Sequence, residues 1–285
     1  MKNKTFNNIE APKAFPMGEF TAAYALHLAD NSLIMGHRLS EWTGHGPMLE
    51  QDIAISNIAL DLIGQSRNFY QYAARLLNAE NKSAGTESSS FEQELGEVTE
   101  DTLAYLRDAR SFKNLLIAEI SNGDWAKTIL KLFFFSAYQF YFYERLKSSA
   151  DDQLSAIAEK SHKEVTYHLR WSGEWVVRLG DGTEESNRRI KLALEEIWPY
   201  TGEMFEPAGY EKICEKRQVG VAVNEIKNAW LGKVAEVLDK ATLSHPDEEN
   251  TWMQSGGKNG IHTEQLGFIL AEMQFLQRAY PGCEW

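Results

Sequence analysis

The chain has 285 residues, enough for one large domain or two small ones with a substantial hydrophobic core. Its 41 acidic and 29 basic residues give a net charge of −12, which disfavours nucleic-acid binding, and no long basic cluster offsets it. The two cysteines, Cys214 and Cys283, form neither a CxxC motif nor a disulfide framework, as expected for a protein of the reducing cytoplasm.

The N-terminal end, residues 1–17, is predicted to be an extended tail. It lacks an apolar stretch of the kind found in secretory signals, so we expect a cytoplasmic location. The most apolar run, residues 129–143, is interrupted by Lys131, Ser136 and Gln139 and is too short to span a membrane. We therefore expect no membrane association and interpret this run as a core helix.

Helical periodicity dominates the rest of the chain. It predicts helices over residues 18–43, 48–78, 97–119, 124–148, 151–179, 186–205, 222–243 and 262–279. Turn-forming residues separate these segments, and strand-like alternation occurs only briefly, in the segment QVGVAV (218–223). No linker is long enough to divide the chain, so the sequence predicts one all-α domain over residues 18–285.

Short loops determine how the longest helices pair. Helices 18–43 and 48–78 are joined by a few residues, and so are helices 124–148 and 151–179. Helices joined in this way pack antiparallel. Two such hairpins predict a four-helix bundle, with the remaining helices flanking it.

The helix predicted over residues 151–179 has an inner stripe that places polar side chains among apolar ones. Glu164 and His168 lie on this stripe, one turn apart. The stripe consists of Leu154, Ile157, Ser161, Glu164, Val165, His168, Ser172, Trp175 and Leu179.

The first two predicted helices also carry mixed stripes. On helix 18–43, charged and apolar residues share one face, formed by Asp30, Ile34, Arg38 and Glu41. On helix 48–78, the side expected to be buried consists of Ile53, Leu60, Ile63 and Phe69, and a polar row consists of Asn57, Asp61 and Gln65. Such a stripe indicates a solvated edge, a buried ion-pair network or a row of metal ligands.

Hairpin geometry brings these polar residues to common levels. If the first turn centres near residue 45, Asp30 lies opposite Asp61. If the second centres near residue 149, Glu164 lies opposite Phe135 and Ser136, and His168 lies opposite Lys131. This layout is similar to that of carboxylate-bridged di-iron bundles, in which two helices each give a carboxylate and two give Glu-x-x-His.

The ligand set nevertheless looks incomplete. Gly64 stands where a histidine would be needed, and Phe135 and Ser136 are poor iron ligands. Glu164 and His168 are four residues apart rather than three. The literal Glu-x-x-His match, Glu159 and His162, falls on the opposite side of its helix.

We therefore predict a metal-free, ion-paired core without catalytic or cofactor-binding residues. Its expected pairs are Lys131 with Glu164, and Arg38 with Asp61 or Asp30. The vestigial ligand positions are Asp30, Asp61, Glu164 and His168, and the buried polar network is Arg38, Glu41, Gln65 and Lys131.

Four segments carry a resemblance to a known family. They are LADNSLIMGHRLSEWTGHGP (28–47), LDLIGQSRNFYQYAA (60–74), EVTYHLRWSGEW (164–175) and SGGKNGIHTEQLGFILAEMQFLQRAYPGCEW (255–285). In this order they resemble the PaaC subunits of bacterial phenylacetyl-CoA oxygenases, also called ring 1,2-epoxidases. The resemblance extends from about residue 20 to the end of the chain.

The resemblance implies a ferritin-like, structural and non-catalytic subunit of an NADPH- and O2-dependent monooxygenase complex in aerobic phenylacetate degradation. It implies a PaaA-type partner that holds the di-iron centre and binds the substrate, and a PaaB-type bridging subunit. It also implies a PaaE-type reductase carrying FAD and an iron–sulfur cluster. No cofactor is expected in this chain, and homodimerisation of the isolated chain stays open. The C-terminal motif is expected to form an interface or a bundle cap, hinged at residues 256–260.

Two alternatives from other classes remain. The chain could be an independent di-iron oxidase or oxygenase that uses Asp30, Asp61, Glu164 and His168, or a ferritin-like metal-storage protein. The missing second histidine and the missing carboxylate on helix 124–148 count against both.

Overall fold

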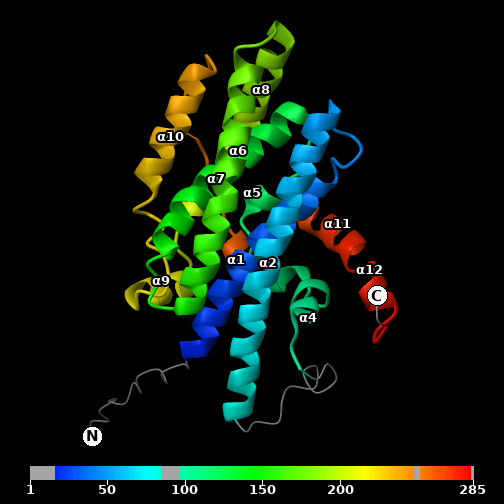
Figure 1. Cartoon of the computed structure of the whole chain (residues 1–285), viewed down its shortest axis with the longest axis vertical. Helices are drawn as coiled ribbons and strands as arrows, with labels where there is room; N and C mark the ends of the chain where they lie inside the picture. The colour runs from blue at the N-terminus through cyan, green and yellow to red at the C-terminus, as the bar shows by residue number, and fades with distance from the viewer. Residues whose placement is uncertain (1–16, 85–96, 247–250, 284–285) are drawn as a thin grey trace, which may run out of the picture.

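The computed structural model describes residues 17–84, 97–246 and 251–283, and all regular secondary structure in these ranges is helical (Figure 1). The predicted tail lies outside the described residues, apart from Met17, which begins the first helix. The QVGVAV segment is irregular rather than a strand. Within the described residues, none of the helices is both long and apolar enough to cross a membrane.

Four long helices form the bundle. They are α1 (Met17–Ser40), α2 (Leu49–Ala84), α6 (Trp125–Leu146) and α7 (Asp152–Gly180). The pairs α1–α2 and α6–α7 are antiparallel hairpins, as predicted, and they lie side by side in Figure 1. Aspartates begin the second pair: the carboxylate of Asp124 accepts from the backbone N–H of Lys127 at 3.0 Å, and that of Asp151 accepts from Leu154 at 2.9 Å.

Shorter helices surround the bundle. They are α4 (Glu100–Tyr105), α5 (Leu116–Glu119), α8 (Glu184–Ile197), α9 (Gly209–Lys216), α10 (Lys227–Lys240), α11 (Glu264–Met273) and α12 (Phe275–Ala279). Four 3₁₀ turns are η1 (Ala109–Ser111), η2 (Trp198–Tyr200), η3 (Gly202–Phe205) and η4 (Gly257–Asn259). Helices α8 and α10 pack on α6 and α7, α9 packs on α1, and α11 packs on α5 and η1.

A tryptophan cluster joins the two hairpins. The ring of Trp125 at the start of α6 packs edge-on against Trp42, Trp171 and Trp175, with centroids 5.2, 6.1 and 5.9 Å away. The indole N–H of Trp42 also donates to the hydroxyl of Thr128 at 2.9 Å. Edge-to-face packing of this kind adds to the stabilisation from burial, so the loop after α1 is fixed to the second hairpin.

The predicted helix over residues 97–119 is wrong in its middle. The chain forms α4, then η1 and α5, and residues 106–115 are mostly non-helical. In this segment the backbone N–H of Lys113 donates to Asp30 at 2.8 Å, and that of Leu115 donates to Asn31 at 2.7 Å. Side chains of α1 therefore satisfy backbone groups that a helix would otherwise have paired.

Other boundaries differ for local reasons. The predicted helix over residues 186–205 ends at Ile197 because Pro199 follows, and two 3₁₀ turns continue the chain. On α2, Ile53 and Leu60 were expected inside, yet both are more than half exposed, and Ile63 is only partly buried. The fully buried side is instead formed by Ile55, Ile58, Leu62 and Phe69.

Candidate functional site: polar clusters within the bundle

Asp30 lies at the centre of the first polar cluster and is completely buried. Its carboxylate accepts from the guanidinium of Arg107, the hydroxyl of Tyr70 and the backbone N–H of Lys113. The guanidinium of Arg107 also donates to the Tyr70 hydroxyl at 3.0 Å and lies 4.2 Å from the centroid of the Phe112 ring. The carboxylate is thus enclosed by donors from α2 and from the segment between α4 and α5.

The negative charge of Asp30 stabilises the protonated forms of Tyr70 and Arg107. Burial raises the pKa of Tyr70, and the negative charge of Asp30 raises it further, so the phenol stays protonated. Burial alone lowers the pKa of Arg107, but the charges of Asp30 and Tyr70 and the hydrogen bonds to them together raise the pKa overall. Asp30 and Arg107 therefore form a charge-assisted pair with little solvent contact.

A second cluster joins α2 to α7. Nε2 of His168 lies 2.9 Å from a carboxylate oxygen of Asp61, and the histidine is fully buried whereas the Asp61 side chain is 40% exposed. Because the carboxylate can only accept, the imidazole places its proton on Nε2. Nδ1 then lacks a hydrogen-bond partner among the described residues.

A third cluster is built around Glu164, which lies one turn before His168 on α7. The amide nitrogen of Gln65 donates to its carboxylate at 2.9 Å, and the amide oxygen of Gln65 accepts from the hydroxyl of Tyr143 at 3.3 Å. Lys160 lies 4.0 Å away on the solvent side. Burial raises the pKa of Tyr143, so its hydroxyl remains a donor.

A fourth cluster is built around Asn122, in the turn before α6. Its amide nitrogen donates to the carboxylate of Glu41 at 2.9 Å, and its amide oxygen accepts from Lys131 at 2.8 Å. Arg38 donates to Glu41 at 2.7 Å and to the backbone carbonyl of Glu119 at 2.9 Å. Burial, reinforced by the positive charge of Arg38, lowers the pKa of Lys131 to about 7.

The structure separates several residues that the sequence paired. Asp30 contacts Tyr70 rather than Asp61, because Gly18 packs on Glu80 and Gly36 packs on Ile63, which centres the first hairpin near residue 49. Lys131 pairs with neither Glu164 nor His168, and Arg38 pairs with neither Asp30 nor Asp61. Arg38, Glu41 and Lys131 share one network through Asn122, whereas Gln65 belongs to another.

Two residues that the sequence analysis did not identify, Arg107 and Asn122, determine which polar side chains pair in these clusters. Arg107 comes from the segment whose helix was predicted wrongly, and Asn122 comes from a turn. The only signal of their role was a basic or amide residue beside an otherwise apolar stretch. Of the Glu-x-x-His match, Glu159 pairs with Lys163 on the surface, and His162 packs against Phe140 and lies 3.0 Å from Glu144.

The donor set does not fit a di-iron centre. Asp30 is enclosed by Arg107, Asp61 is paired with His168, and Glu164 is held by Gln65, so the four positions do not converge on one point. In the ranges that the structure describes, no three His, Cys, Asp or Glu side chains are placed to hold a metal ion. No reaction step is therefore assigned to a metal in this chain.

A separate buried ionic cluster fixes the loop before α11, residues 254–263, which we call the clasp loop. Glu203 accepts from the backbone N–H groups of Gly256 at 2.8 Å and Lys258 at 3.3 Å, and the Lys258 amine lies 3.0 Å from Glu211. Glu119 accepts from Nδ1 of His262 at 2.8 Å and from the backbone N–H of the next residue.

The charge state of the clasp loop follows from these contacts. Burial alone lowers the pKa of His262, but the hydrogen bond to Glu119 and its charge raise the pKa overall. Burial raises the pKa of Glu203, and the backbone N–H groups of Leu116, Gly256 and Lys258 lower it in part. With its backbone and side chains held at both ends, the loop is a fixed connection rather than the hinge that its glycines suggested.

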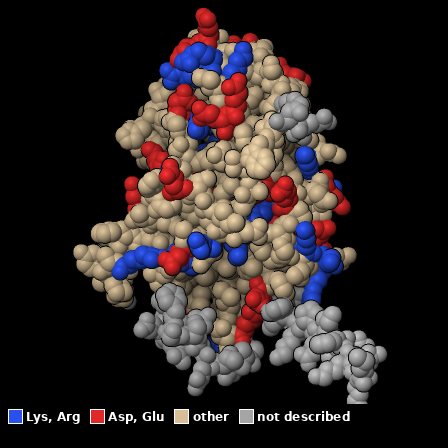
Figure 2. Space-filling view, turned by 180° about the vertical axis from the view of Figure 1, so that it is seen from behind, with Lys and Arg blue, Asp and Glu red and all other residues tan. Residues whose placement is uncertain are grey.

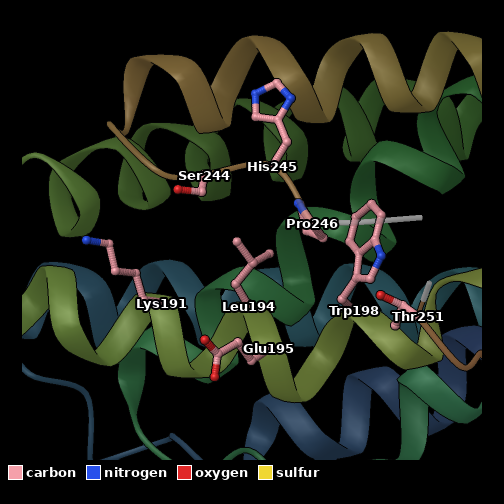
Figure 3. Close-up of a pocket in the computed structure, with 8 residues that line it drawn as sticks. All are labelled: Lys191, Leu194, Glu195, Trp198, Ser244, His245, Pro246 and Thr251. Carbon is pink, nitrogen blue, oxygen red and sulfur yellow. The ribbon is translucent and has the colours of Figure 1, made fainter. Parts of the chain in front are cut away.

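A cavity of about 390 Å³ lies away from all these clusters, between α8 and the segment after α10. Leu194 and Trp198 lie on one side of it and Ser244 and Pro246 on the other, while the ring of His245 points away from Leu194 (Figure 3). It contains none of the predicted site residues.

Comparison with known proteins agrees with the fold and the motifs. Residues 11–285 match the family model described as phenylacetic acid catabolic protein. The chain is also 42% identical, over 269 residues, to a curated protein of Escherichia coli (strain K12) that is named as the C-type subunit of 1,2-phenylacetyl-CoA epoxidase, covering 94% of this chain and 100% of that protein. These matches confirm the resemblance found in the four motifs. The chain belongs to the family of phenylacetic acid catabolic proteins.

Proposed function

We propose that this chain is a structural, non-catalytic subunit of a phenylacetyl-CoA epoxidase complex. In this proposal a PaaA-type subunit holds the di-iron centre and the substrate, and a PaaB-type subunit bridges the assembly. A PaaE-type reductase with FAD and an iron–sulfur cluster delivers electrons from NADPH. The relative from Escherichia coli, named as a subunit of such an epoxidase and matched over its whole length, supports membership in the complex.

The observation that carries the non-catalytic role is the occupation of the candidate ligands by the chain's own side chains. A metal at Asp30 would have to displace Arg107, whose side chain is only 13% exposed. Leaving one partner of a buried ion pair uncompensated costs roughly 3–5 kcal/mol. Asp61 and His168 alone would offer two donors, too few for a di-iron centre.

Metal analysis tests the proposal. The chain purified alone should contain no stoichiometric iron, and iron should appear in the preparation only when a PaaA-type subunit is co-expressed. About two irons per isolated chain, lost in Asp61→Asn and Asp30→Asn variants, would overturn the proposal.

Reconstitution gives a second test that separates structure from chemistry. The complex assembled with the His168→Gln or Asp61→Asn variant should retain turnover within about twofold, because neither side chain touches substrate in the proposal. Complexes lacking this chain should lose turnover. A variant that folds and assembles normally yet abolishes turnover would contradict the non-catalytic role.

A further inference from the structure

The C-terminal arm, residues 261–283, exposes more large apolar side chains than is usual for a solvent-exposed helix. Helices α11 and α12 project from the side of the bundle (Figure 1), and from behind the arm forms a lobe at the left covered mostly by uncharged residues (Figure 2). Five large apolar side chains on it are between 47% and 69% exposed: Ile261, Phe268, Phe275, Leu276 and Tyr280. The opposite side, with Leu266, Ile269 and Leu270, is already buried.

We call the exposed apolar residues of the arm the seam. Ile261 lies in the loop before α11, Phe268 lies on α11, and Phe275 and Leu276 begin α12. A helix that is apolar on both sides is typically covered on both sides. The buried side packs on α5 and η1, so the exposed side has the pattern of a surface that receives a second helix.

Two hollows adjoin this seam and provide room for side chains of such a helix. They have volumes of about 520 and 550 Å³ and share Ala109 and Gly267. A Cβ atom added at Gly267 would meet no heavy atom within 4 Å, so the groove between η1 and α11 is open at its floor. Arg110 and Glu264 stand beside one end, and Arg278, paired with Asp108 at 3.0 Å, stands beside the other.

The arm is held in place before any partner binds. The clasp loop fixes its start through Glu119 and Glu203. Farther along, the side-chain amide of Gln274 donates to the backbone carbonyls of Ala104 and Arg107 at 3.2 and 3.0 Å. A surface that is already ordered loses little conformational entropy on binding, which favours affinity.

We infer that the C-terminal arm is a docking surface for one helix of the iron-holding subunit of the complex, an inference that rests on the proposed function. The docking helix carries aliphatic side chains that pack against Phe268 and Phe275, and a carboxylate that meets Arg110.

The exposed area matches this role. An aromatic side chain contributes roughly 150–250 Å², so the five exposed side chains present on the order of 500 Å². A standard interface buries about 800 Å² on each partner, and free monomers seldom expose contiguous apolar patches much larger than a few hundred Å². The arm would thus supply more than half of one side of a stable heteromeric contact.

Charge favours a different subunit over a second copy of this chain. Each copy carries a net charge of −12, so self-association brings two acidic surfaces together.

The test compares two charge insertions. The Phe268→Asp variant alters the arm, and the Leu192→Asp variant alters a similarly exposed apolar side chain on α8 as a matched control. Each full-length variant is titrated with the purified iron-holding subunit by calorimetry, after circular dichroism has established unchanged melting. The arm variant should bind at least 100-fold more weakly, and the control within threefold of the unaltered chain.

The outcomes separate this inference from the proposed function. If the unaltered chain binds the iron-holding subunit and the arm variant binds equally well, the docking surface is wrong and the proposed function stands. If the unaltered chain does not bind that subunit at all, both are wrong. If the arm variant abolishes a homodimer, seen by sedimentation, while binding of the iron-holding subunit is unchanged, a second copy occupies the arm and the inference is overturned.

Discussion

Lys131 is a buried amine whose pKa is strongly lowered by folding. Its amine is fully buried, and its only described acceptors are the backbone carbonyl of Ile120 at 2.9 Å and the amide oxygen of Asn122 at 2.8 Å. Neither acceptor carries a negative charge. The position is therefore compatible with a neutral amine, and burial has lowered its pKa from 10.5 to about 7.

This shift predicts a pH dependence of stability. Between pH 7 and 10.5 the unfolded chain holds a proton on Lys131 that the folded chain lacks, so the free energy of unfolding rises with pH, by up to ~1.4 kcal/mol per unit from this group. The Lys131→Met variant lacks this rise. In urea titrations the unaltered chain should gain about 2 kcal/mol relative to the variant between pH 7 and pH 9.

The comparison of the unaltered chain with the Lys131→Met variant also provides a control at low pH. Below pH 6 both states of the unaltered chain bind the proton, so the difference between the two proteins should be constant there. A difference that stays flat from pH 6 to pH 9 would mean that the buried amine keeps its charge.

Asp30 and Asp61 are a matched pair of aspartates with different surroundings. The Asp30→Asn variant leaves Arg107 buried without a counter-charge and should lose roughly 3–5 kcal/mol of stability. The Asp61→Asn variant keeps an acceptor for His168 at a partly exposed position and should lose no more than about 1 kcal/mol. Urea denaturation at pH 7 measures both. Similar losses in the two variants would show that burial of the ion pair is not what distinguishes them.

These residues also show what the sequence could and could not provide. Helical periodicity correctly placed Glu164 and His168 towards the bundle, because a stripe requires only the rotation per residue. It did not give their partners, because a partner depends on the register between helices and on the path of irregular segments. Arg107 reaches Asp30 from residues 106–115, a path that local sequence patterns do not determine.

At the level of elements, the first hairpin shows how a small error in register changes an entire site. The turn was centred at residue 45, but α2 begins only at Leu49 and the pairs centre near residue 49. Moving the centre of the hairpin by about four residues moves the opposing residue by about twice as many, which takes Asp30 from the level of Asp61 to the level of Tyr70. Helix α2 also has apolar residues on two sides, so the pattern alone could not decide which side is buried.

The clasp loop permits a sharp test of how the C-terminal arm is attached. A Cβ atom at Gly257 would lie 2.2 Å from the backbone carbonyl oxygen of Asn114, so Gly257→Ala should displace the loop and cost about 2 kcal/mol or more. A Cβ atom at Gly232, inside α10, would meet nothing within 4 Å. Gly232→Ala should therefore stabilise the chain by about 0.5–1 kcal/mol.

Thermal melting followed by circular dichroism compares the two glycine variants directly. Opposite signs of the shift in Tm are expected. If Gly257→Ala melted at or above the unaltered chain, the close approach of the clasp loop to the segment before α5 would not contribute to stability.

For the whole molecule, the acidic surface and the apolar arm lead to different expectations about assembly. A net charge of −12 opposes association with another acidic protein and is screened by salt. Burial of the arm is non-directional, depends on apolar area and responds weakly to salt. The balance of these two contributions can be measured without any substitution.

We therefore predict that affinity for the iron-holding subunit changes less than tenfold when NaCl is raised from about 0.1 to about 0.5 M, because screening weakens the contact between a carboxylate and Arg110 but leaves the apolar contact intact. Calorimetry over a range of temperatures should also give a negative heat-capacity change on binding, the signature of apolar burial. Affinity that fell more than tenfold over the same range of salt would mean that ion pairs dominate the contact. In that case the exposed phenylalanines of the arm could not be its main contribution, even if the arm lies within the interface.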